Sequence, residues 1–496
     1  MSNSRSTLSK QLTRRSFLRG TIVGTAAASA YALSPKSWAQ VKGANETLNV
    51  GVIGFKGRGG AHISGMRALQ QKEKGVRITA LCDVDKKVLD AGVQSFDKLN
   101  LKVEGYSDLR QMMEDKNLDV VCIATPNHWH ALAAIWAVQA GKDVYVEKPV
   151  SHNVWEGRQI VNAARKHKKI VQTGTQSRSS QAIAEAAKWI QAGNIGKIKY
   201  ARGLCYKPRG SIGLIQAEQP IPNDIDYDLW CGPAPLDPLR RKNLHYDWHW
   251  VWNYGNGDLG NQGIHQMDIC RWILGEMELS PRVWSVGGRL GYKDDGQTPN
   301  TQIVFHDYAK APLIFEVRGL PRAKGDKAMD NYLGGSVSVV VECEGGHLLV
   351  PGYSNAIVKD KDGKTIKEFK GSSDHFENFI EAVRSRKHTD LNADILEGHL
   401  SSALCHTGNI SYRLGKQLAQ GEIRDQIKAD RGAADSVGRM IEHLKANEVN
   451  LDMDKLVMGP ALNMNPKTEK FIGNAAADKL LTRDYRKPFV VPDLTT

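Results

Sequence analysis

The sequence predicts an α/β protein in which an N-terminal doubly wound parallel sheet is followed by a C-terminal α+β domain with a mostly antiparallel open sheet. Three observations lead to this prediction. Short apolar strands alternate with helices near the start of the chain, which is typical of a parallel sheet covered on both faces. A glycine-rich turn, GVIGFKGRGG, follows the first strand. After residue 197 several strands follow one another across short breaks that contain Gly, Asp or Pro, which indicates antiparallel pairing.

The N-terminal elements follow a short polar connector at residues 40–46. Apolar segments predict strands at 48–55, 76–84, 119–125, 142–149 and 170–176. Helical spacing of apolar side chains predicts helices at 61–71, 86–99, 130–141 and 155–169. We place the end of this domain, residues 47–173, just before Gly174.

The second domain, residues 174–416, is predicted to begin with a helix at 180–193. Its strands are expected at 197–206, 282–292, 301–307, 311–320, 336–345 and 347–352, and later helices at 375–386 and 398–420. Residues 417–496 are expected to form a C-terminal extension that packs on the body of the protein. The sequence contains no internal repeat.

Residues 1–39 have the features of a twin-arginine export signal. The pair RR at 14–15 precedes FL at 17–18, a weakly apolar run follows at 21–33, and SWA at 37–39 is a small-x-small cleavage site. A membrane anchor is the alternative, but the run is shorter than the ~20 apolar residues that a span needs. We therefore expect the Tat export machinery as a partner and a location in the periplasm or otherwise outside the cytoplasmic membrane.

The charge and the cysteines argue against several other classes of protein. The formal charge of +13 includes six Lys or Arg within residues 1–39, where there is no acid, so the remainder carries only +7. No basic stripe interleaved with aromatics is present, and nucleic acid is not expected as a partner. No later segment predicts a membrane span, and no metal site is expected. The seven cysteines are odd in number and lie mostly in apolar patterns, which favours buried free thiols over disulfides.

The turn GVIGFKGRGG has the setting of a dinucleotide-binding loop but carries Lys56 where G-x-G-x-x-G has its second glycine. Gly54 and Gly59 occupy the first and third positions, and Gly57 follows the lysine. Lys56 and Arg58 can each bring a cation to a phosphate, so the loop can still bind an anion. A tight turn without a ligand is the alternative.

Asp83 ends the next predicted strand, 24 residues after Gly59, about where a ribose-binding acid is expected. Asp83 and Asp85 would repel a 2′-phosphate, which favours NAD over NADP. Lys86 and Lys87 follow directly, so NADP stays open as an alternative.

Taken together, these segments resemble the Gfo/Idh/MocA family, named after glucose-fructose oxidoreductase, inositol dehydrogenase and a rhizopine-catabolism protein. The resemblance is carried by GVIGFKGRGG, CDVD, IATPNHWHALAA, AGKDVYVEKP, QTGTQSRS, AGNIGKIKYARG, GNGDLGNQGIHQMDICRWILG and FIEAVRSRK, spread over residues 48–415. It implies a Rossmann domain that binds NAD(P) and an α/β domain whose open sheet forms contacts in a homodimer or homotetramer. The active site is then expected between the two domains.

The resemblance also assigns roles to single residues. Lys148 of the EKP signature and His265 correspond to the catalytic lysine and histidine. The residues expected on the cofactor are Gly54, Phe55, Lys56, Gly57, Arg58, Gly59, Asp83, Thr125, Pro126, Asn127, His130, Glu147 and Lys148.

The chemistry of the two catalytic candidates agrees with these roles. A hydride leaves a carbinol carbon only if a base takes the hydroxyl proton, and a lysine is suitable when burial lowers its pKa. His265 can exchange the same proton near neutral pH. The alternatives are a surface Lys148 paired with Glu147, and a His265 that is only part of the core.

Five residues are expected on the substrate: Asn261, Asp268, Arg209, Tyr206 and Trp248. Many relatives carry an aspartate four residues before the histidine, where this chain has Asn261. An amide can position a hydroxyl group but cannot accept its proton, so the proton chemistry would depend on His265 and Lys148.

The segment NLHYDWHWVWNYGNG carries aromatic residues at every second position from Tyr246 to Tyr254. Aromatic rings stack on the apolar faces of sugars, while Asp and His can bind the hydroxyl groups, which predicts a carbohydrate pocket. A strand with one aromatic face in the core is an equal alternative, because period-two aromatics are common in strands.

The expected function is that of an exported oxidoreductase that acts on a sugar, glycoside or cyclitol with tightly bound NAD(P). Export constrains the reaction, because a cofactor loaded before export has to return to its starting redox state in each cycle. A redox-neutral, NAD-dependent glycoside hydrolase that works through a transient keto-sugar is one alternative. A non-catalytic sugar-binding protein on the same fold is the other.

Overall fold

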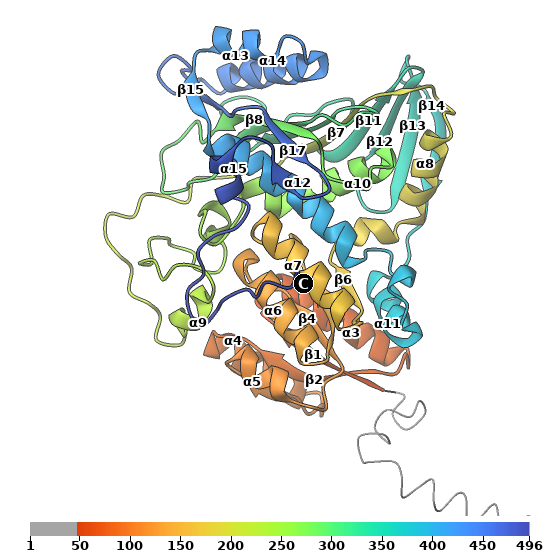
Figure 1. Ribbon diagram of the computed structural model, residues 1–496, viewed down its shortest axis with the longest axis vertical. Helices are drawn as coiled ribbons and strands as arrows, with labels where there is room; N and C mark the ends of the chain where they lie inside the picture. Colours follow the sequence, from red (N-terminus) through yellow and green to blue (C-terminus); the bar gives the residue numbers. More distant parts are fainter. Residues whose placement is uncertain (1–46, 496) are drawn as a thin grey trace, which may run out of the picture. The chain divides into compact units, whose positions relative to one another are not determined.

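The computed structural model describes residues 47–495 (Figure 1). The chain divides into two compact units, Met1–Leu48 and Asn49–Thr496, and nearly all described residues belong to the second. The predicted export signal lies outside the described residues. Within 47–495, no helix is long and apolar enough to cross a lipid bilayer.

The first sheet has six strands, all paired in parallel in the order β3-β2-β1-β4-β5-β6. They are β1 (Leu48–Ile53), β2 (Val76–Cys82), β3 (Glu104–Tyr106), β4 (Val120–Ile123), β5 (Asp143–Val146) and β6 (Val171–Thr173). Both faces of β4 and β5 are buried, which explains their continuous apolar sequences. The strand order reverses between β1 and β4, and such a reversal opens a ligand crevice at the carboxyl ends of the strands.

Five helices accompany this sheet: α3 (Arg58–Gln71), α4 (Lys86–Asp97), α5 (Leu109–Glu114), α6 (Asn127–Gln139) and α7 (Val154–Lys166). The sequence predicted all of these elements except β3 and α5, which are short; β3 is also largely exposed and has no apolar pattern. Helix α6 is buried almost throughout, because the C-terminal segment covers it and packs Phe489 against Trp129 at 5.5 Å between ring centroids.

The second sheet has twelve strands, and the predicted antiparallel arrangement is confirmed apart from the parallel pair β7 and β10. The strands are β7 (Ile198–Tyr206), β8 (Arg282–Gly288), β9 (Thr301–His306), β10 (Leu313–Arg318), β11 (Val337–Cys343), β12 (Gly346–Val350), β13 (Asn355–Asp360), β14 (Thr365–Lys370), β15 (Lys416–Leu418), β16 (Leu456–Met458), β17 (Leu462–Asn465) and β18 (Lys470–Phe471). The prediction found the central strands but not β13 to β18.

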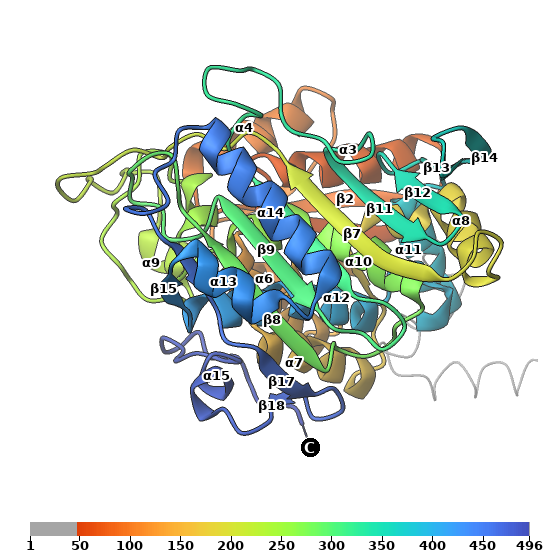
Figure 2. The ribbon, with the colours of Figure 1, turned by 90° about the horizontal axis from the view of Figure 1, so that it is seen from above.

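One face of this sheet packs on α8 (Gln181–Gln191), α10 (Ile264–Leu274) and α12 (Ile395–Arg413). The opposite face is covered over β8 to β10 by α13 (Gln420–Ile427) and α14 (Arg431–Ala446), which lie across the strands in Figure 2. The remaining α-helices after α7 are α9 (Tyr227–Cys231), α11 (His375–Ser385) and α15 (Ala475–Lys479).

A buried group of charged side chains joins α14 to the sheet. Glu316 of β10, only 1% exposed, pairs with Arg439 at 2.6 Å and with Arg202 at 3.3 Å. Burial opposes the charge of Glu316, but the two guanidinium groups outweigh it and lower its pKa to about 2. All seven cysteines are buried and unpaired, as the sequence predicted.

Candidate functional site

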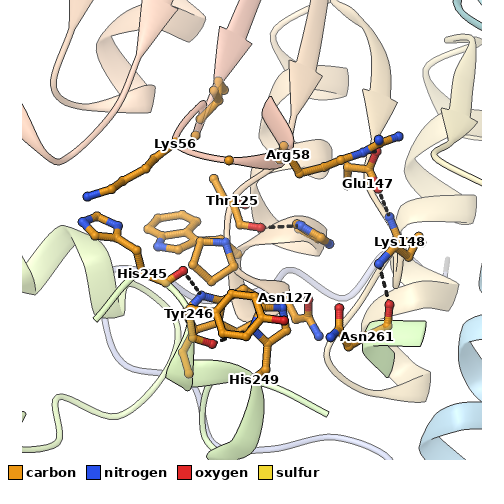
Figure 3. Close-up of a pocket in the computed structure, with 18 of the residues that line it drawn as sticks. Lys56, Arg58, Thr125, Asn127, Glu147, Lys148, His245, Tyr246, His249 and Asn261 are labelled. Atoms are coloured by element: carbon orange, nitrogen blue, oxygen red, sulfur yellow. Dashed lines mark hydrogen bonds and ion pairs between the residues drawn. The ribbon is translucent and has the colours of Figure 1, made fainter. Parts of the chain in front are cut away.

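A cavity of about 470 Å³ lies at the carboxyl ends of β1, β2, β4 and β5, where residues of the second domain close it (Figure 3). Lys56 and Arg58 lie on one side of it, and Tyr246 and His249 on the other, with Lys148 between Glu147 and Asn261. Such a volume suits a small ligand or part of a larger one.

The glycines of the β1–α3 turn are required by close packing. Gly54 has φ 71°, and a Cβ there would lie 2.9 Å from the Thr125 amide nitrogen. A Cβ on Gly59 would lie 2.2 Å from the Gly54 carbonyl oxygen. Gly57, with φ 86°, is the N-cap of α3 and has open space around it. The turn therefore keeps Gly54 and Gly59 for packing, while Gly57 leaves the helix N-terminus open to the cavity.

Two of the predicted cofactor residues do not line the cavity. Phe55 turns its ring to Gly92, where a Cβ would lie 2.5 Å from it, and contributes only an amide that donates to Asp83 at 3.1 Å. Gly59 lies behind the turn. Both residues pack within the loop, and their contact with the cofactor stays a prediction.

Asp83 lines the cavity after β2, in the predicted place. Its carboxylate accepts from the amides of Phe55 and Asp85, the latter at 3.0 Å, and burial raises its pKa to about 6. Asp85 instead faces Lys56 at 3.7 Å and His245 at 2.9 Å. The lysine at the anomalous loop position is thus held by a carboxylate at the edge of the cavity.

Backbone contacts between the domains cross the cavity beside Asp85. The Lys86 amide donates to the Asp224 carbonyl at 2.8 Å, and Asp85 forms an isolated antiparallel bridge with Ile225. With the His245–Asp85 pair, these contacts hold the segment 222–249 across this end of the cavity. We call this segment the strap.

Glu147 is a buried carboxylate that pairs with the exposed Arg58 and the buried His62. It accepts from Arg58 at 2.7 Å and from His62 at 3.1 Å. Burial opposes its charge, but the hydrogen bond from His62 and the charge of Arg58 outweigh it and hold the Glu147 pKa well below its usual range. Arg58 is therefore largely neutralised by Glu147, although it still lines the cavity.

Lys148 and His265, the predicted catalytic pair, both line the cavity. Lys148 Nζ donates to the backbone oxygen of Asn261 at 2.6 Å, and burial lowers its pKa. His265 is the second residue of α10, which directly follows a π-helical turn at Leu259–Gly263. Its Nδ1 is buried without a partner, and burial together with the Lys148 charge lowers the His265 pKa to about 3. Lys148 is therefore not a surface residue, and His265 is not a satisfied core histidine.

Thr125, Pro126, Asn127 and His130 also line the cavity, as predicted. The His130 ring nitrogens lie 2.7 Å from the Thr125 carbonyl and 2.6 Å from the Pro149 carbonyl, which ties the β4–α6 loop to the end of β5. Asn127 donates to Asn256 at 3.0 Å. The Thr125 hydroxyl is buried without a protein partner.

Three of the predicted substrate residues lie outside the cavity lining. Tyr206 is buried and donates to Glu316 at 2.7 Å, and Arg209 forms a bidentate pair with Asp258, with contacts down to 2.6 Å. Asp268 is 1% exposed and pairs with Arg178 at 2.8 Å. Each is neutralised or hydrogen-bonded within the protein, so these three predictions are corrected to structural roles.

Asn261 and Trp248 do line the cavity, although the contact recorded for Asn261 comes from its backbone carbonyl. The aromatic segment is not the strand considered as an alternative: residues Asp247–Trp250 form a 3₁₀ turn. Trp250 and Tyr254 are buried, whereas Trp248, Tyr246 and His249 line the cavity.

Several lining residues were not among the predicted site residues, chiefly His245, Gln176, Gln262 and Tyr353. The Tyr353 ring follows β12 and lies 5.5 Å from that of His265 between centroids. Gln176 and Gln262 lie in segments that carry the family resemblance and His245 lies in the aromatic segment, but no role in the site was predicted for any of them. Tyr353 lies in no such segment.

The donor set fits NAD. The uncapped N-terminus of α3 would receive the pyrophosphate, the Asp83 carboxylate a ribose, and the unpartnered Thr125 hydroxyl is available to the rest of the cofactor. Among the described residues, no cluster of three or more His, Cys, Asp or Glu could hold a metal ion.

Two profiles of one oxidoreductase family match the chain. The profile of its NAD-binding Rossmann fold matches residues 48–175, and that of its C-terminal α/β domain matches residues 197–446.

Curated relatives are similar over part of the chain. Inositol 2-dehydrogenase of Salmonella typhimurium is 29% identical over 161 residues, 32% of this chain and 46% of that protein. Levoglucosan dehydrogenase of Pseudarthrobacter phenanthrenivorans is 30% identical over 179 residues, 36% of this chain and 39% of that protein. A glycosyl hydrolase family 109 protein of Shewanella pealeana is 36% identical over 129 residues, 25% and 27% of the two chains. The chain thus aligns with less than half the length of each.

Solved structures share the fold over a larger part of the chain. A levoglucosan dehydrogenase in complex with NADH and levoglucosan is 20% identical, with a TM-score of 0.53 over 72% of this chain and 95% of that one. The WlbA dehydrogenase of Bordetella pertussis, in complex with NADH and UDP-GlcNAcA, is 18% identical, with a TM-score of 0.53 over 72% and 94%.

Proposed function

Since the chain belongs to the Gfo/Idh/MocA family of NAD-binding oxidoreductases, we propose that it oxidises a hydroxyl group of a sugar, glycoside or cyclitol in the cavity that Lys148 and His265 share. The observation that carries the proposal is this shared cavity: a half-buried lysine and an imidazole whose Nδ1 has no partner face the same space as the dinucleotide-binding turn. The relatives named inositol 2-dehydrogenase and levoglucosan dehydrogenase support a polyhydroxylated substrate.

The proton chemistry belongs to the protein, while NAD, when bound, supplies the hydride acceptor. Lys148 takes the hydroxyl proton: burial lowers its pKa, and the hydrogen bond to the Asn261 carbonyl fixes the direction of Nζ. His265 is neutral at working pH, so it can donate or accept a hydrogen bond beside the same hydroxyl group.

We further propose that the cofactor is NAD, retained through the catalytic cycle in an exported protein. Asp83 and Asp85 disfavour a 2′-phosphate, and the strap closes over the cavity beside them. A retained cofactor suits a compartment without a supply of free nucleotide. It requires that each oxidation be followed by a reduction within the same site.

A redox-neutral glycoside hydrolase is the second candidate. The relative named glycosyl hydrolase family 109 protein favours it, and it uses the same first step, oxidation of a glycoside hydroxyl. The keto-sugar then loses its aglycone, and the hydride held by the reduced cofactor returns to the sugar.

Absorbance of the purified protein at the reduced-nicotinamide band, before and after addition of candidate sugars, tests the proposal. Growth or bleaching of the band is expected for a sugar oxidoreductase. An unchanged band with release of aglycone from a nitrophenyl glycoside would favour the hydrolase. A protein that yields no nucleotide on denaturation and takes up no NAD would contradict both.

A further inference from the structure

The aromatic segment places a further imidazole in the cavity, that of His249. Its ring stacks on Trp248 with centroids 3.7 Å apart and lies beside Tyr246, with centroids 4.7 Å apart. Figure 3 shows His249 and Tyr246 on the side of the cavity opposite the Lys56–Arg58 loop.

Contacts of both the backbone and the ring hold His249 in place. The 3₁₀ turn packs on Gly255, where a Cβ would lie 2.6 Å from the His249 Cα. The Tyr246 carbonyl oxygen receives both the His249 amide, at 3.2 Å, and the ring nitrogen Nδ1, at 2.6 Å. The imidazole therefore has one orientation relative to the cavity.

The hydrogen bond to Tyr246 also sets the tautomer. A carbonyl oxygen only accepts, so Nδ1 carries the proton and donates it. Burial, together with the charges of Lys148 and Arg209, outweighs the hydrogen bond to Tyr246 and lowers the His249 pKa to about 3, so the ring stays neutral at working pH. Nε2 is then left as a lone-pair acceptor. His265 differs, because its Nδ1 has no partner to fix a tautomer.

We infer that His249 is a substrate-binding residue whose Nε2 accepts a hydrogen bond from a second hydroxyl group of the sugar ring, distinct from the one that is oxidised. The inference rests on the proposed function and specifies its substrate. A fixed acceptor between two aromatic rings suits a ring that is apolar on its face and carries hydroxyl groups at its edge.

The inference is tested with His249→Asn, His249→Gln and the control His167→Asn, which changes an exposed histidine at the end of α7. Gln can place an amide oxygen near the position of Nε2, whereas Asn replaces only the Nδ1 side of the ring. Steady-state kinetics use the holoprotein with its retained NAD, whichever of myo-inositol, levoglucosan or methyl β-D-glucopyranoside the wild type oxidises, and a saturating keto-sugar that reoxidises the bound NADH in each cycle. His249→Asn is expected to raise KM about three- to tenfold with kcat within about twofold, His249→Gln to raise it less, and the control to match the wild type.

Monodeoxy analogues of the same sugar identify the hydroxyl group. For the wild type, removal of the hydroxyl that His249 binds should lower kcat/KM about three- to tenfold, and His249→Asn should lose most of this discrimination. A folded His249→Asn variant with the KM and the deoxy discrimination of the wild type would overturn the inference. Equal loss of kcat for all analogues, at unchanged KM, would also overturn it.

A measurement without turnover separates this inference from the proposed function. NMR spectra are recorded on holoprotein labelled with ¹⁵N-histidine, and the ring signals of His249 are identified as those that disappear in His249→Gln. At pH 7 these signals should show a protonated Nδ1 and an unprotonated Nε2. A protonated Nε2 would overturn the inference whatever the activity. If the wild type oxidises none of the three sugars while this tautomer is found, the proposed substrate class fails and the assignment of Nε2 as acceptor stands.

Discussion

At the scale of single residues, the function of a charged side chain here depends on its partner. Lys148 has only a backbone carbonyl as its hydrogen-bond acceptor and remains chemically available, whereas Arg209 and Asp268 are each neutralised by a buried partner. Sequence motifs singled out Lys148 and His265, and both line the cavity. The motifs could not exclude Arg209 or Tyr206, because Asp258 and Glu316 lie 49 and 110 residues away in the chain and only the fold brings them into contact.

Replacement of Lys148 should lower the rate of proton transfer without preventing the protein from folding. We expect Lys148→Met and Lys148→Arg to lower kcat by about 10²- to 10⁴-fold, because neither side chain can take a proton at neutral pH. In the wild type, kcat should rise with pH and level off below the usual lysine pKa of 10.5, since burial lowers the pKa of Lys148. Rate profiles from pH 6 to pH 10 and thermal unfolding of each variant measure these effects. Wild-type rates in either variant would contradict the assigned role.

Asp268 is expected to act on stability and not on substrate binding. Asp268→Asn would remove one of the two carboxylates that Arg178 and Arg271 share, the other being Glu397. It should cost up to about 3 kcal/mol, the lower end of the about 3–5 kcal/mol that is usual for breaking a buried ion pair, because Glu397 remains. KM should stay within about twofold, because Asp268 does not line the cavity. Urea unfolding and KM are measured on the same preparation. A large rise in KM at unchanged stability would contradict this structural role and would support the prediction from the sequence that Asp268 binds the substrate.

At the scale of elements, the β1–α3 turn is the part of the site that the sequence predicted best. A strand followed by a glycine turn and a helix is a pattern of residues that are close in the sequence, so it can be recognised without knowledge of the rest of the fold. The aromatic segment was ambiguous, because a period of two indicates a strand only if neighbouring strands are available to pair with it. Residues 247–250 instead turn in a 3₁₀ helix that directs Trp248 and His249 into the cavity.

Two adjacent glycines of the turn provide a matched test. Gly59→Ala would place a methyl group 2.2 Å from the Gly54 carbonyl oxygen, and we expect it to weaken NADH binding at least about tenfold and to destabilise the protein by about 1–3 kcal/mol. Gly60→Ala meets its nearest atom at 3.8 Å and should bind NADH normally, with a gain of up to about 1 kcal/mol in helix stability. Fluorescence titration with NADH and thermal unfolding compare the two. Equal NADH affinity in both variants would show that the close packing of Gly59 is not required.

At the scale of the whole molecule, burial of many histidines sets the response to acid. The pKa is lowered to about 3 for His128, His249, His265, His306 and His406, and to about 4 for His375 and His443. Below pH 6.5 the unfolded chain takes up protons at these positions while the folded chain does not, so stability falls with pH. Each histidine can cost up to about 1.4 kcal/mol per pH unit in this range. Asp83 opposes the trend because burial raises its pKa, and burial also raises the pKa of Glu156, Asp247 and Glu276.

We therefore expect the free energy of unfolding to drop by on the order of 5 kcal/mol between pH 7 and pH 5. Urea unfolding followed by tryptophan fluorescence at pH 7, 6 and 5 measures the drop. Proton uptake on unfolding at pH 5.5 gives an independent measure. A urea midpoint that does not change over this range would contradict the assignment of these histidines as neutral in the folded protein.

The sequence predicted the two sheets but not how the C-terminal residues are used. The strands after β12 are short or exposed, and the amphipathic helices α13 and α14 do not reveal which surface they cover. That surface is the outer face of β8 to β10, where Glu316, Arg439 and Arg202 form their buried group. Long-range pairing of this kind leaves no local signal in the sequence.

The last residues of the chain have a consequence for how the protein is handled. Phe489 supports Trp129 from behind, and Trp129 is itself part of the cavity wall, on the helix that begins at Asn127. A gene shortened to residue 446, where the family profile ends, would therefore encode a protein without Phe489, and Trp129 would lose a ring that supports it in the cavity wall. An affinity tag fused after Thr496 needs a spacer, so that it does not disturb the packing of Phe489 on Trp129.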